Sequence, residues 1–339
     1  MKTAIILLTL TMSSIATAQS ALREQLHREA QQYQATVAEA ANTFLNQRLP
    51  VERRLKAIEP HAALYDEKQI AQFRNVVADE QEPDEIRAAA LARIIEYVPN
   101  DDRIGRLVIK WLGNPKDPIV LRRAALRTDS ALAFEHMQLP EVYQKMLEDP
   151  EPEFRLYAFS RLVPHGDARA QQLLIAGLQN PRAALLPAPV AIAILSTAPK
   201  SDALPTLLEV AQNTKDEAAR VEAIRLLGGY EPARKTLVDI SRNAGEKDDA
   251  RAAALSALYA GDREHIVEYA TPILTSEASP NLQALAIQMT TSVRQNMTYR
   301  FKAKRADSYD RLVEKISREG APEVRKAAQV YIETVRPKY

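Results

Sequence analysis

Five histidines and several paired carboxylates are the side chains of this chain that could do acid–base or metal chemistry. The histidines are His27, His61, His136, His165 and His265. None has another histidine three or four residues away, the spacing that places two zinc ligands on one helical face. Signatures of zinc proteases, nucleophile elbows, phosphate loops and dinucleotide folds are also absent from the sequence. The sequence therefore predicts no catalytic residue, metal site or cofactor, and we expect a protein that is not an enzyme.

The side chains best suited to binding a macromolecule are basic and aromatic, and they occur in two settings. One set projects between buried positions of expected helices and comprises Arg93, Tyr97, Arg127, Tyr157, Arg161 and Arg225. The other lies in a segment near 294–307 that contains Tyr299, Arg300, Phe301, Lys302 and Lys304. Alternating basic and aromatic residues suit a phosphate, a lipid headgroup or an acidic partner. A solvated loop or an extended helix is the alternative explanation of this segment.

A repeat in the sequence indicates the helices on which these residues lie. One alanine, called the repeat alanine below, recurs at Ala90, Ala125, Ala158, Ala191, Ala223, Ala254, Ala286 and Ala328. The intervals are about 30 to 35 residues, a period typical of stacked-repeat proteins, and only the last is about ten residues longer. Three residues before each repeat alanine stands an arginine, the repeat arginine, except at Ala188 and Gln283. A small residue at this point lets neighbouring helices approach closely, because a larger side chain would overpack the interface.

Each unit is expected to form two helices, since apolar residues recur at spacings of three and four. The first helices are predicted at about 66–78, 102–113, 138–148, 167–179, 202–212, 231–243, 262–276 and 307–319. The second helices are predicted at about 83–98, 117–133, 151–163, 184–198, 216–228, 248–260, 280–293 and 321–335. Acidic residues such as Asp248 and Asp249 stand at helix starts, where they cap exposed amides. The repeat arginines are expected to pair along the stack of loops, because they recur in units that need not share a ligand.

The second helix carries the motif Asp-x-x-x-Arg-x-x-Ala-Leu, which occurs from Asp248 to Leu255 with one spacing residue fewer. This motif resembles the HEAT repeat family, and the short period is closest to the compact bacterial HEAT-like form first associated with phycobilisome lyases. The resemblance covers roughly 60–335. It implies an all-α fold, an α-α superhelix of about eight two-helix repeats, and a concave face of second helices that holds a partner.

Two other segments depart from the repeat. Residues 19–59 are interpreted as a capping, coiled-coil-like helix, with a seam at Leu26, Ala30, Tyr33, Val37, Ala40 and Phe44. A dimer through 21–49 is the alternative to a cap. In the fourth unit, Pro187 and Pro189 predict a kinked or delayed start of the second helix. The repeats themselves are expected to occupy 60–339, interrupted by the segment near 294–307.

The N-terminal residues 1–18 are typical of a signal peptide. Lys2 precedes an apolar stretch, and Ala16-Thr17-Ala18 forms a small-x-small cleavage site. An uncleaved N-terminal anchor is the alternative, and no later stretch is apolar enough to span a membrane. The chain contains no cysteine, which removes disulfides and thiolate sites and suits a bacterial periplasm.

Charge separates the remaining function classes. The chain has 45 basic and 44 acidic residues, and removal of Lys2 with the leader makes the two counts equal. A chain without net charge has no global field to attract nucleic acid, so no nucleic-acid partner is expected. We therefore expect an exported, non-catalytic scaffold that binds a protein partner on its concave face. The alternative is an accessory protein or enzyme that acts on cell-wall or lipid substrates of the envelope.

Overall fold

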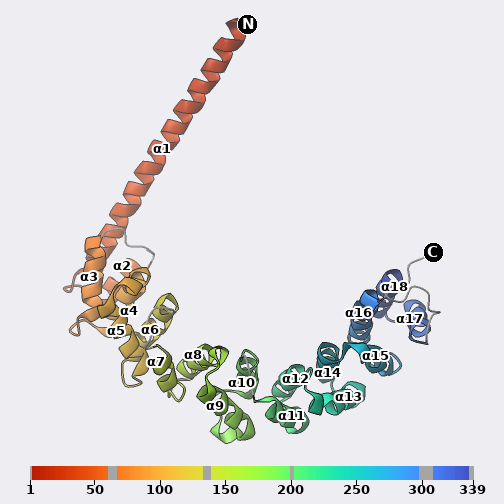
Figure 1. Ribbon diagram of the computed structural model, residues 1–339. Helices are drawn as coiled ribbons and strands as arrows, with labels where there is room; N and C mark the ends of the chain where they lie inside the picture. The colour runs from red at the N-terminus through yellow and green to blue at the C-terminus, as the bar shows by residue number, and fades with distance from the viewer. Residues whose placement is uncertain (1, 60–66, 133–138, 199–201, 298–307, 336–339) are drawn as a thin grey trace. The chain divides into compact units, whose positions relative to one another are not determined.

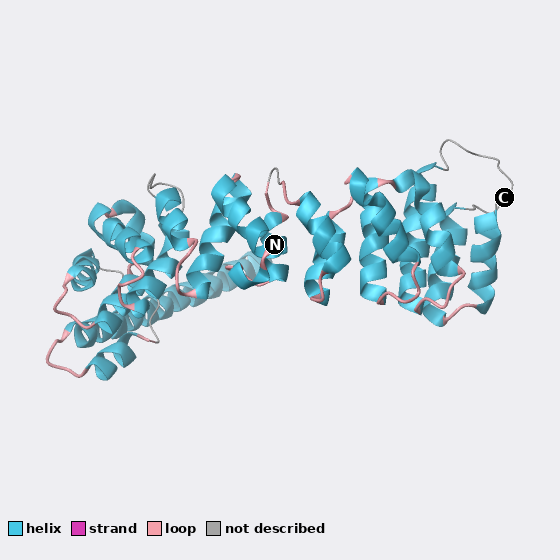
Figure 2. Cartoon of the chain, turned by 90° about the horizontal axis from the view of Figure 1, so that it is seen from below, coloured by secondary structure: helices cyan, strands magenta, loops and turns pink. Residues whose placement is uncertain are grey.

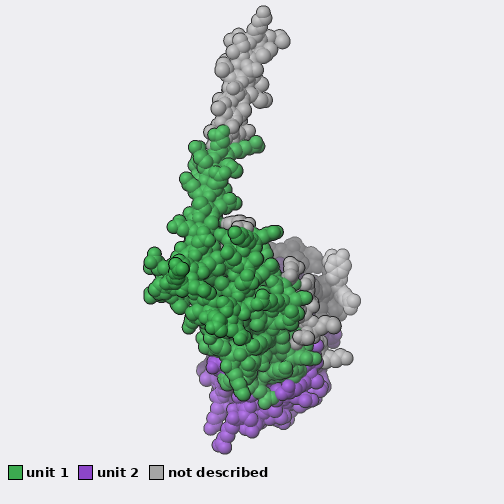
Figure 3. All heavy atoms as spheres, turned by 90° about the vertical axis from the view of Figure 1, so that its left-hand side faces the viewer, with its two compact units in different colours: residues 1–150 green, residues 151–339 purple. Residues whose placement is uncertain are grey.

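The computed structural model describes residues 2–59, 67–132, 139–198, 202–297 and 308–335. All regular elements of these residues are helices, as Figure 2 shows. The chain forms two compact units, residues 1–150 and residues 151–339, which are coloured separately in Figure 3. In the described part of the chain, no helix combines the length and the apolar character that crossing a bilayer requires.

Unit 1 holds seven α-helices and one 3-10 helix among its described residues. They are α1 (Lys2–Leu45), α2 (Val51–Ile58), α3 (Glu67–Ala78), α4 (Asp84–Arg93), η1 (Ile95–Asn100), α5 (Asp102–Gly113), α6 (Ile119–Leu132) and α7 (Leu139–Met146). Consecutive helices pack in pairs, α1 on α2, α3 on α4 and α5 on α6, and the second helices α4 and α6 also pack on each other. The labels in Figure 1 follow this order.

Unit 2 continues the alternation, again counted over described residues. Its elements are α8 (Pro152–Leu162), η2 (Val163–His165), α9 (Ala168–Gln179), η3 (Pro181–Ala183), α10 (Ala188–Leu195), α11 (Leu204–Asn213), α12 (Glu217–Leu226), η4 (Glu231–Ala233), α13 (Arg234–Arg242), α14 (Asp248–Gly261), η5 (Arg263–His265), α15 (Ile266–Leu274), α16 (Pro280–Met297), α17 (Ser308–Glu319) and α18 (Pro322–Val335). The second helices α10, α12, α14, α16 and α18 contact one another in sequence.

The repeat alanines lie in the core between these helices. All eight are buried, and Ala90, Ala223 and Ala254 have no exposed surface. Six of them are followed by a large apolar residue that is also buried, such as Leu91 or Ile224, whereas Leu126 is half-buried and Ala328 is followed by Gln329. The methyl group therefore sits at the closest approach of successive helices, as the sequence predicts, and a longer side chain has no room there.

Two predicted second helices have different boundaries in the structure, one at its C-terminal end and one at its N-terminal start. The helix predicted at 83–98 ends as α-helix at Arg93, because Ile94 leaves helical geometry at φ −107° and ψ 15°. The chain continues as the 3-10 helix η1, and Pro99 within it lacks the N–H that an α-helical ladder would need. The helix predicted at 184–198 begins only at Ala188, directly after Pro187. This confirms the delayed start that the two prolines of the fourth unit predict.

The repeat arginines bind carbonyls of the preceding first helix. The Nε atoms of Arg87, Arg220 and Arg251 donate to Val77 O, Ala211 O and Ser241 O at 3.1, 2.9 and 3.2 Å. These carbonyls belong to the last turn of a first helix, where carbonyls have no intrahelical donor. Each of the three arginines is the fourth residue of its own helix. The arginine thus ties the end of one helix to the start of the next.

The guanidinium tip of the arginine reaches forward to the next unit. Arg220 forms two bonds of 2.6 and 2.8 Å with the carboxylate of Glu246, and Arg122 pairs with Asp149 in the same way. The planar fork of arginine suits this role, because it can meet a carbonyl and a carboxylate at once. The prediction that the arginines pair along the stack of loops is confirmed at these positions.

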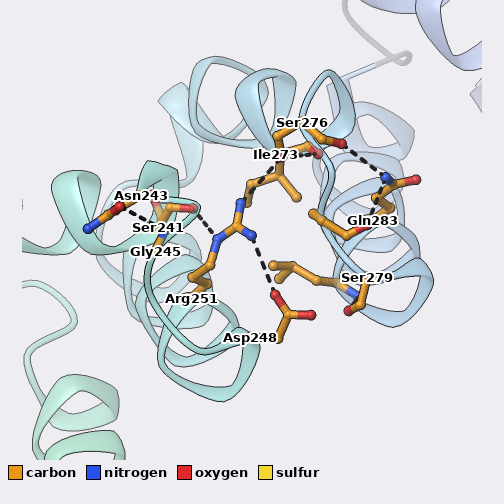
Figure 4. Close-up of polar contacts among 11 residues, drawn as sticks. Ser241, Asn243, Gly245, Asp248, Arg251, Ile273, Ser276, Ser279 and Gln283 are labelled. Carbon is orange, nitrogen blue, oxygen red and sulfur yellow. Dashed lines mark hydrogen bonds and ion pairs between the residues drawn. The ribbon is translucent and has the colours of Figure 1, made fainter.

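Figure 4 shows the position of the repeat arginine in two neighbouring second helices of unit 2, α14 and α16. Arg251 lies between the Ser241 carbonyl, the Asp248 carboxylate at 3.4 Å and the Ser276 hydroxyl at 3.4 Å. Gln283 takes the arginine's place in α16, and its Nε2 donates to Ala278 O at 3.1 Å and Ser276 O at 3.4 Å. A neutral amide therefore serves the loop carbonyls where the sequence lacks the arginine.

The N-terminal segment contains one further arginine of this kind, which the sequence analysis did not include. Arg54 is the fourth residue of α2; its Nε donates to Phe44 O at 2.6 Å and its guanidinium pairs with Glu82 at 2.7 and 3.0 Å. Burial opposes ionisation of Glu82, but hydrogen bonds from Arg54 and Gln47 outweigh it and hold the pKa of Glu82 below its usual value. Arg54, Ala57 and Ile58 match the pattern of the later units.

The predicted seam of α1 is divided between a covered and an uncovered part. Val37, Ala40 and Phe44 are buried against the helices that follow, and Phe44 stacks on Phe73 with ring centroids 4.9 Å apart. Leu26 and Tyr33 on the same seam are 56% and 44% exposed. The described N-terminal part of α1 extends away from the other helices of unit 1 (Figure 1). The C-terminal end of α1 is therefore part of the core of unit 1.

Candidate functional site

In α2, α14, α16 and α18, one face of the second helix remains open after the core has formed. It is built from the residues five and two positions before the repeat alanine and two positions after it, and we call it the groove face. Spacings of three and four residues place these positions on one side of a helix. In α16 they are Asn281, Ala284 and Gln288, and in α18 they are Glu323, Lys326 and Val330.

The groove faces of α14, α16 and α18 line a groove of about 790 Å³ in unit 2. Its floor is apolar and includes Ala252, Leu285 and Val330, the last of which is 49% exposed. Its rim carries Asp248, Asp249, Glu323 and Lys326, and Asp248 is also paired with Arg251 at 3.4 Å, which leaves one carboxylate in excess. The three carboxylates lie in the first turns of α14 and α18. The groove thus offers apolar contact area beside an excess of negative charge.

A smaller groove of about 460 Å³ lies on the second helices α2 and α4 of unit 1. From α2 it is lined by Glu52, Leu55 and Glu59, which hold the groove-face positions relative to Ala57. Arg93 from α4 completes it and donates to Ile58 O at 2.6 Å, and burial lowers the pKa of its guanidinium. The predicted contact residue Arg93 therefore does line a groove, with part of its hydrogen-bonding capacity used to cap α2.

The other predicted contact residues do not form one cluster. Arg127 is exposed on α6 and Tyr97 lies half-buried in η1. Tyr157 and Arg161 are brought together on α8, where Arg161 donates to the Tyr157 hydroxyl at 2.9 Å and lies 5.0 Å from its ring centroid. Arg225 on α12 is 54% exposed and pairs with Glu222 one turn earlier. Apart from the pair on α8, these residues occupy separate helices.

Five predicted contact residues of the segment near 294–307 lie outside the described residues. They are Tyr299, Arg300, Phe301, Lys302 and Lys304. Arg294, which the sequence places at the start of the insertion, is instead part of α16. Its Nη1 donates to Asp310 Oδ1 and to the Tyr331 hydroxyl, both at 2.8 Å, and its guanidinium lies 5.0 Å from the Tyr309 ring centroid. Burial and the bond to Asp310 raise the pKa of Tyr331. Arg294 therefore joins α16 to α17 and α18.

One titratable cluster lies at the end of α14. The Asp262 carboxylate accepts from the Tyr269 hydroxyl at 2.6 Å and contacts His265 Nδ1 at 2.7 Å. These bonds lower the pKa of Asp262 and raise the pKa of His265, while burial and Asp262 raise the pKa of Tyr269 to about 12. The side chains thus hold one another at the turn between α14 and α15. Within the described ranges, no three His, Asp or Glu residues are grouped to hold a metal ion.

Comparison with known proteins adds no relative to this description. A scan against models of protein families finds no match, and a search of curated proteins finds no similar chain. The candidate site therefore rests on the geometry of the second helices.

Charged and aromatic motifs do not mark the groove of unit 2, so the sequence did not predict it. Three of its floor residues, Ala252, Ala284 and Ala327, carry no functional group. The signal that could have found it is positional. In α14, α16 and α18 the residues five and two before the repeat alanine, and two after it, are exposed or half-buried, so they lie outside the buried face of these three helices.

Proposed function

We propose that this protein is an exported, non-catalytic scaffold that holds a segment of a protein partner along its second helices. The observation that carries the proposal is the groove of unit 2, to which three successive second helices contribute equivalent positions. A surface built by repetition suits an extended partner, because each added repeat lengthens the contact without requiring a new fold.

The architecture we propose is the α-α superhelix of HEAT-like repeats that the sequence motif implies. Two observations support it: the second helices from α10 to α18 contact one another in order, and Arg220 joins its helix pair to the next. The leader-like residues 1–18 and the absence of cysteine support export to a bacterial periplasm.

The chemistry of the groove specifies the kind of partner segment. The apolar floor favours aliphatic or aromatic side chains, which supply most of the energy of a protein interface. The rim of Asp248, Asp249 and Glu323 favours lysine or arginine beside them. We therefore expect a partner segment that alternates apolar and basic residues.

A site-specific crosslinking experiment tests the proposal. A photoreactive residue at position 252 or 330, inside the groove, should capture one partner from the native envelope, and the same residue at Lys235 on α13 should not. Lys235 is exposed and lies on a first helix of the same unit, so it controls for random collision. Capture at both positions alike would contradict the proposed site.

A charge and polarity change in the groove sharpens this test. Val330→Asp and Glu323→Lys should each lower capture roughly tenfold, since an interface loses most when an anchor or its charge partner is removed. Lys235→Glu should leave capture unchanged. Equal melting temperatures of the variants would show that binding, rather than folding, has changed. Capture of no partner by any bait would overturn the scaffold and favour a role toward cell-wall or lipid substrates.

A further inference from the structure

In the fourth repeat Ala188 replaces the repeat arginine, and the space that the arginine side chain would fill is open. Ala188 stands three residues before the repeat alanine Ala191, which is buried together with Ile192 as in the other units. The register of the helix is therefore kept, and only the arginine side chain is absent. A cavity of about 470 Å³ is lined by Ala188 at this place.

The walls of this cavity correspond to the atoms that bind arginine elsewhere. The end of α9 contributes Gly177, Leu178 and Gln179. Leu178 precedes Ala188 by the same ten residues that separate Val77 from Arg87 and Ser241 from Arg251. On the opposite side the loop before α12 contributes Thr214 and Asp216. Other repeats place the carboxylate that receives the guanidinium in the equivalent loop, as Glu246 does for Arg220. Glu246 stands eight residues before its repeat alanine, where this repeat has Lys215, so the carboxylate that lines the cavity is Asp216, one position later.

The electrostatics of the cavity favour a cation. It is lined by the C-terminal ends of two helices, α9 and α11, which carry the negative ends of their helix dipoles. Glu209 and Asp216 add two carboxylates, and the lining contains no lysine, arginine or histidine. Asp216 Oδ1 accepts from Ala219 N at 3.1 Å as the cap of α12. Lys215 of the same loop is exposed and does not line the cavity, so the lining itself is electronegative.

The close approach of the chain keeps this cavity from collapsing around Ala188. A Cβ atom on Gly177 would lie 3.1 Å from Ala184 Cα, so α9 and the segment before α10 are already in contact. That segment stays non-helical after the short helix η3, and the Leu185 carbonyl accepts from Arg155 Nε at 2.9 Å. The start of α10 is therefore held one turn late, and the Ala188 methyl leaves the arginine position unfilled.

We propose that this cavity binds the guanidinium of an arginine side chain supplied by the protein partner. The inference rests on the proposed scaffold function, because it needs a partner. A guanidinium can donate to a helix-end carbonyl and to Asp216 together, as the repeat arginines do with their own carbonyls and carboxylates. A lysine ammonium can place its point charge there but lacks the fork that spans both acceptors.

A small-molecule probe tests the cavity without the partner. N-acetyl-arginine amide should shift the backbone amide signals of residues 178–179, 188 and 213–216 in NMR spectra of the whole protein. N-acetyl-citrulline amide, which has the same shape without the charge, should bind at least roughly tenfold more weakly, since hydrogen bonds to a charged group are the stronger ones. Equal binding of the two amides, or shifts elsewhere only, would overturn the proposal.

Three variants make the probe experiment more specific. Ala188→Arg should fill the cavity from within, abolish the shifts and raise the melting temperature, whereas Ala188→Gln should leave weaker binding. Asp216→Asn preserves the helix cap, because asparagine caps as well as aspartate, but it removes the charge and should weaken binding roughly tenfold. Asp216→Asn decides the question if the arginine variant does not fold. Undiminished binding of N-acetyl-arginine amide to Ala188→Arg and to Asp216→Asn would overturn the site.

The partner assay separates this inference from the proposed function. In the crosslinking experiment from position 330, Ala188→Arg should lose the partner, and N-acetyl-arginine amide should displace it where the citrulline amide does not. A partner retained by Ala188→Arg would overturn the arginine site and leave the scaffold function standing. No partner with any bait would overturn the scaffold itself.

Discussion

Units 1 and 2 use the same arginine position with different partners. In unit 1, Arg54 and Glu82 are both 3% exposed and form a buried ion pair. In unit 2, Arg220 and Glu246 are 16% and 20% exposed, Arg251 meets a hydroxyl and a carbonyl, and Gln283 and Ala188 replace the arginine altogether. The two units share the position three residues before the repeat alanine, but the side chain at this position and its partner vary.

The arginine position therefore has two separable roles, one in folding and one in binding. Where the pair is buried, its charges depend on each other, because an unpaired buried ion is strongly destabilising. Where the pair is half-exposed, water solvates part of the charge, and the position can hold a neutral side chain or a short one such as alanine. The position can then serve binding instead of folding, as we propose at Ala188.

The largest expected effect comes from breaking the buried pair of unit 1. Glu82→Gln removes the counterion of Arg54 and should lower the free energy of unfolding by about 3 kcal/mol. Trp111, the one tryptophan of the sequence, is buried in unit 1, so its fluorescence in a urea titration reports this unit. A loss below about 1 kcal/mol, the value of a surface pair, would contradict the distinction between the units.

The next effect compares two glycines that end helices of the two units. A Cβ on Gly261, the last residue of α14, would lie 2.1 Å from Gly229 N, so Gly261→Ala should destabilise unit 2 by about 2 kcal/mol. A Cβ on Gly113, the last residue of α5, would meet only Val142 Cγ1 at 3.5 Å. Gly113→Ala should therefore raise stability by about 0.5 kcal/mol. Circular dichroism during thermal unfolding measures both, and equal effects would contradict the close approach of α12 and α14.

A smaller effect is expected at the half-exposed pair of unit 2. Glu246→Gln should lower the free energy of unfolding by about 1 kcal/mol, since partial exposure screens the charges. The Arg220 hydrogen bond holds the pKa of Glu246 below its usual value, so some stability is lost with the charge. The loss should be visible in circular dichroism but not in the Trp111 fluorescence transition. A change in the tryptophan signal would show that the two units unfold as one.

The smallest effect is a pH dependence at the exposed His265 of unit 2. Asp262 raises the pKa of His265, so the stabilising contact is complete below the ordinary value of 6.5 and is lost as the pH rises through the raised value. The melting temperature should fall slightly over that range, and His265→Gln should remove the dependence. NMR titration should show a lower His265 pKa in Asp262→Asn. An unchanged pKa in that variant would contradict the contact.

The sequence predicted the helices well because their signals are local. Spacings of three and four residues, acidic caps and first-turn prolines act within a few residues of each other, and most predicted helices match the observed ones within two to four residues. The exceptions lie where a neighbouring proline changes the backbone, at Pro99 and Pro187. The repeat arginines Arg87, Arg220 and Arg251 were also assigned correctly to a structural role, because the same contact recurs in repeats that need not share a ligand.

The candidate site was predicted much less completely. Arg93 lines a groove, but the apolar floor of the larger groove consists of residues such as Ala252 and Leu285 that no motif marks. Arg294 was assigned to a binding segment, yet it bonds Asp310 and Tyr331 in the neighbouring helices. A side chain's use depends on what lies opposite it, and that information is distant in the sequence.

The sequence by itself determined the two-helix unit, its period and the places of the alanine and the arginine, since these follow from helical periodicity and side-chain size. The tertiary structure decided which carboxylate each arginine meets, that Arg54 extends the series, and that Ala188 borders an open cavity. It also decided where the groove faces of α14, α16 and α18 line one groove. Such features arise between residues about 30 positions apart, where packing rather than local propensity selects the neighbours.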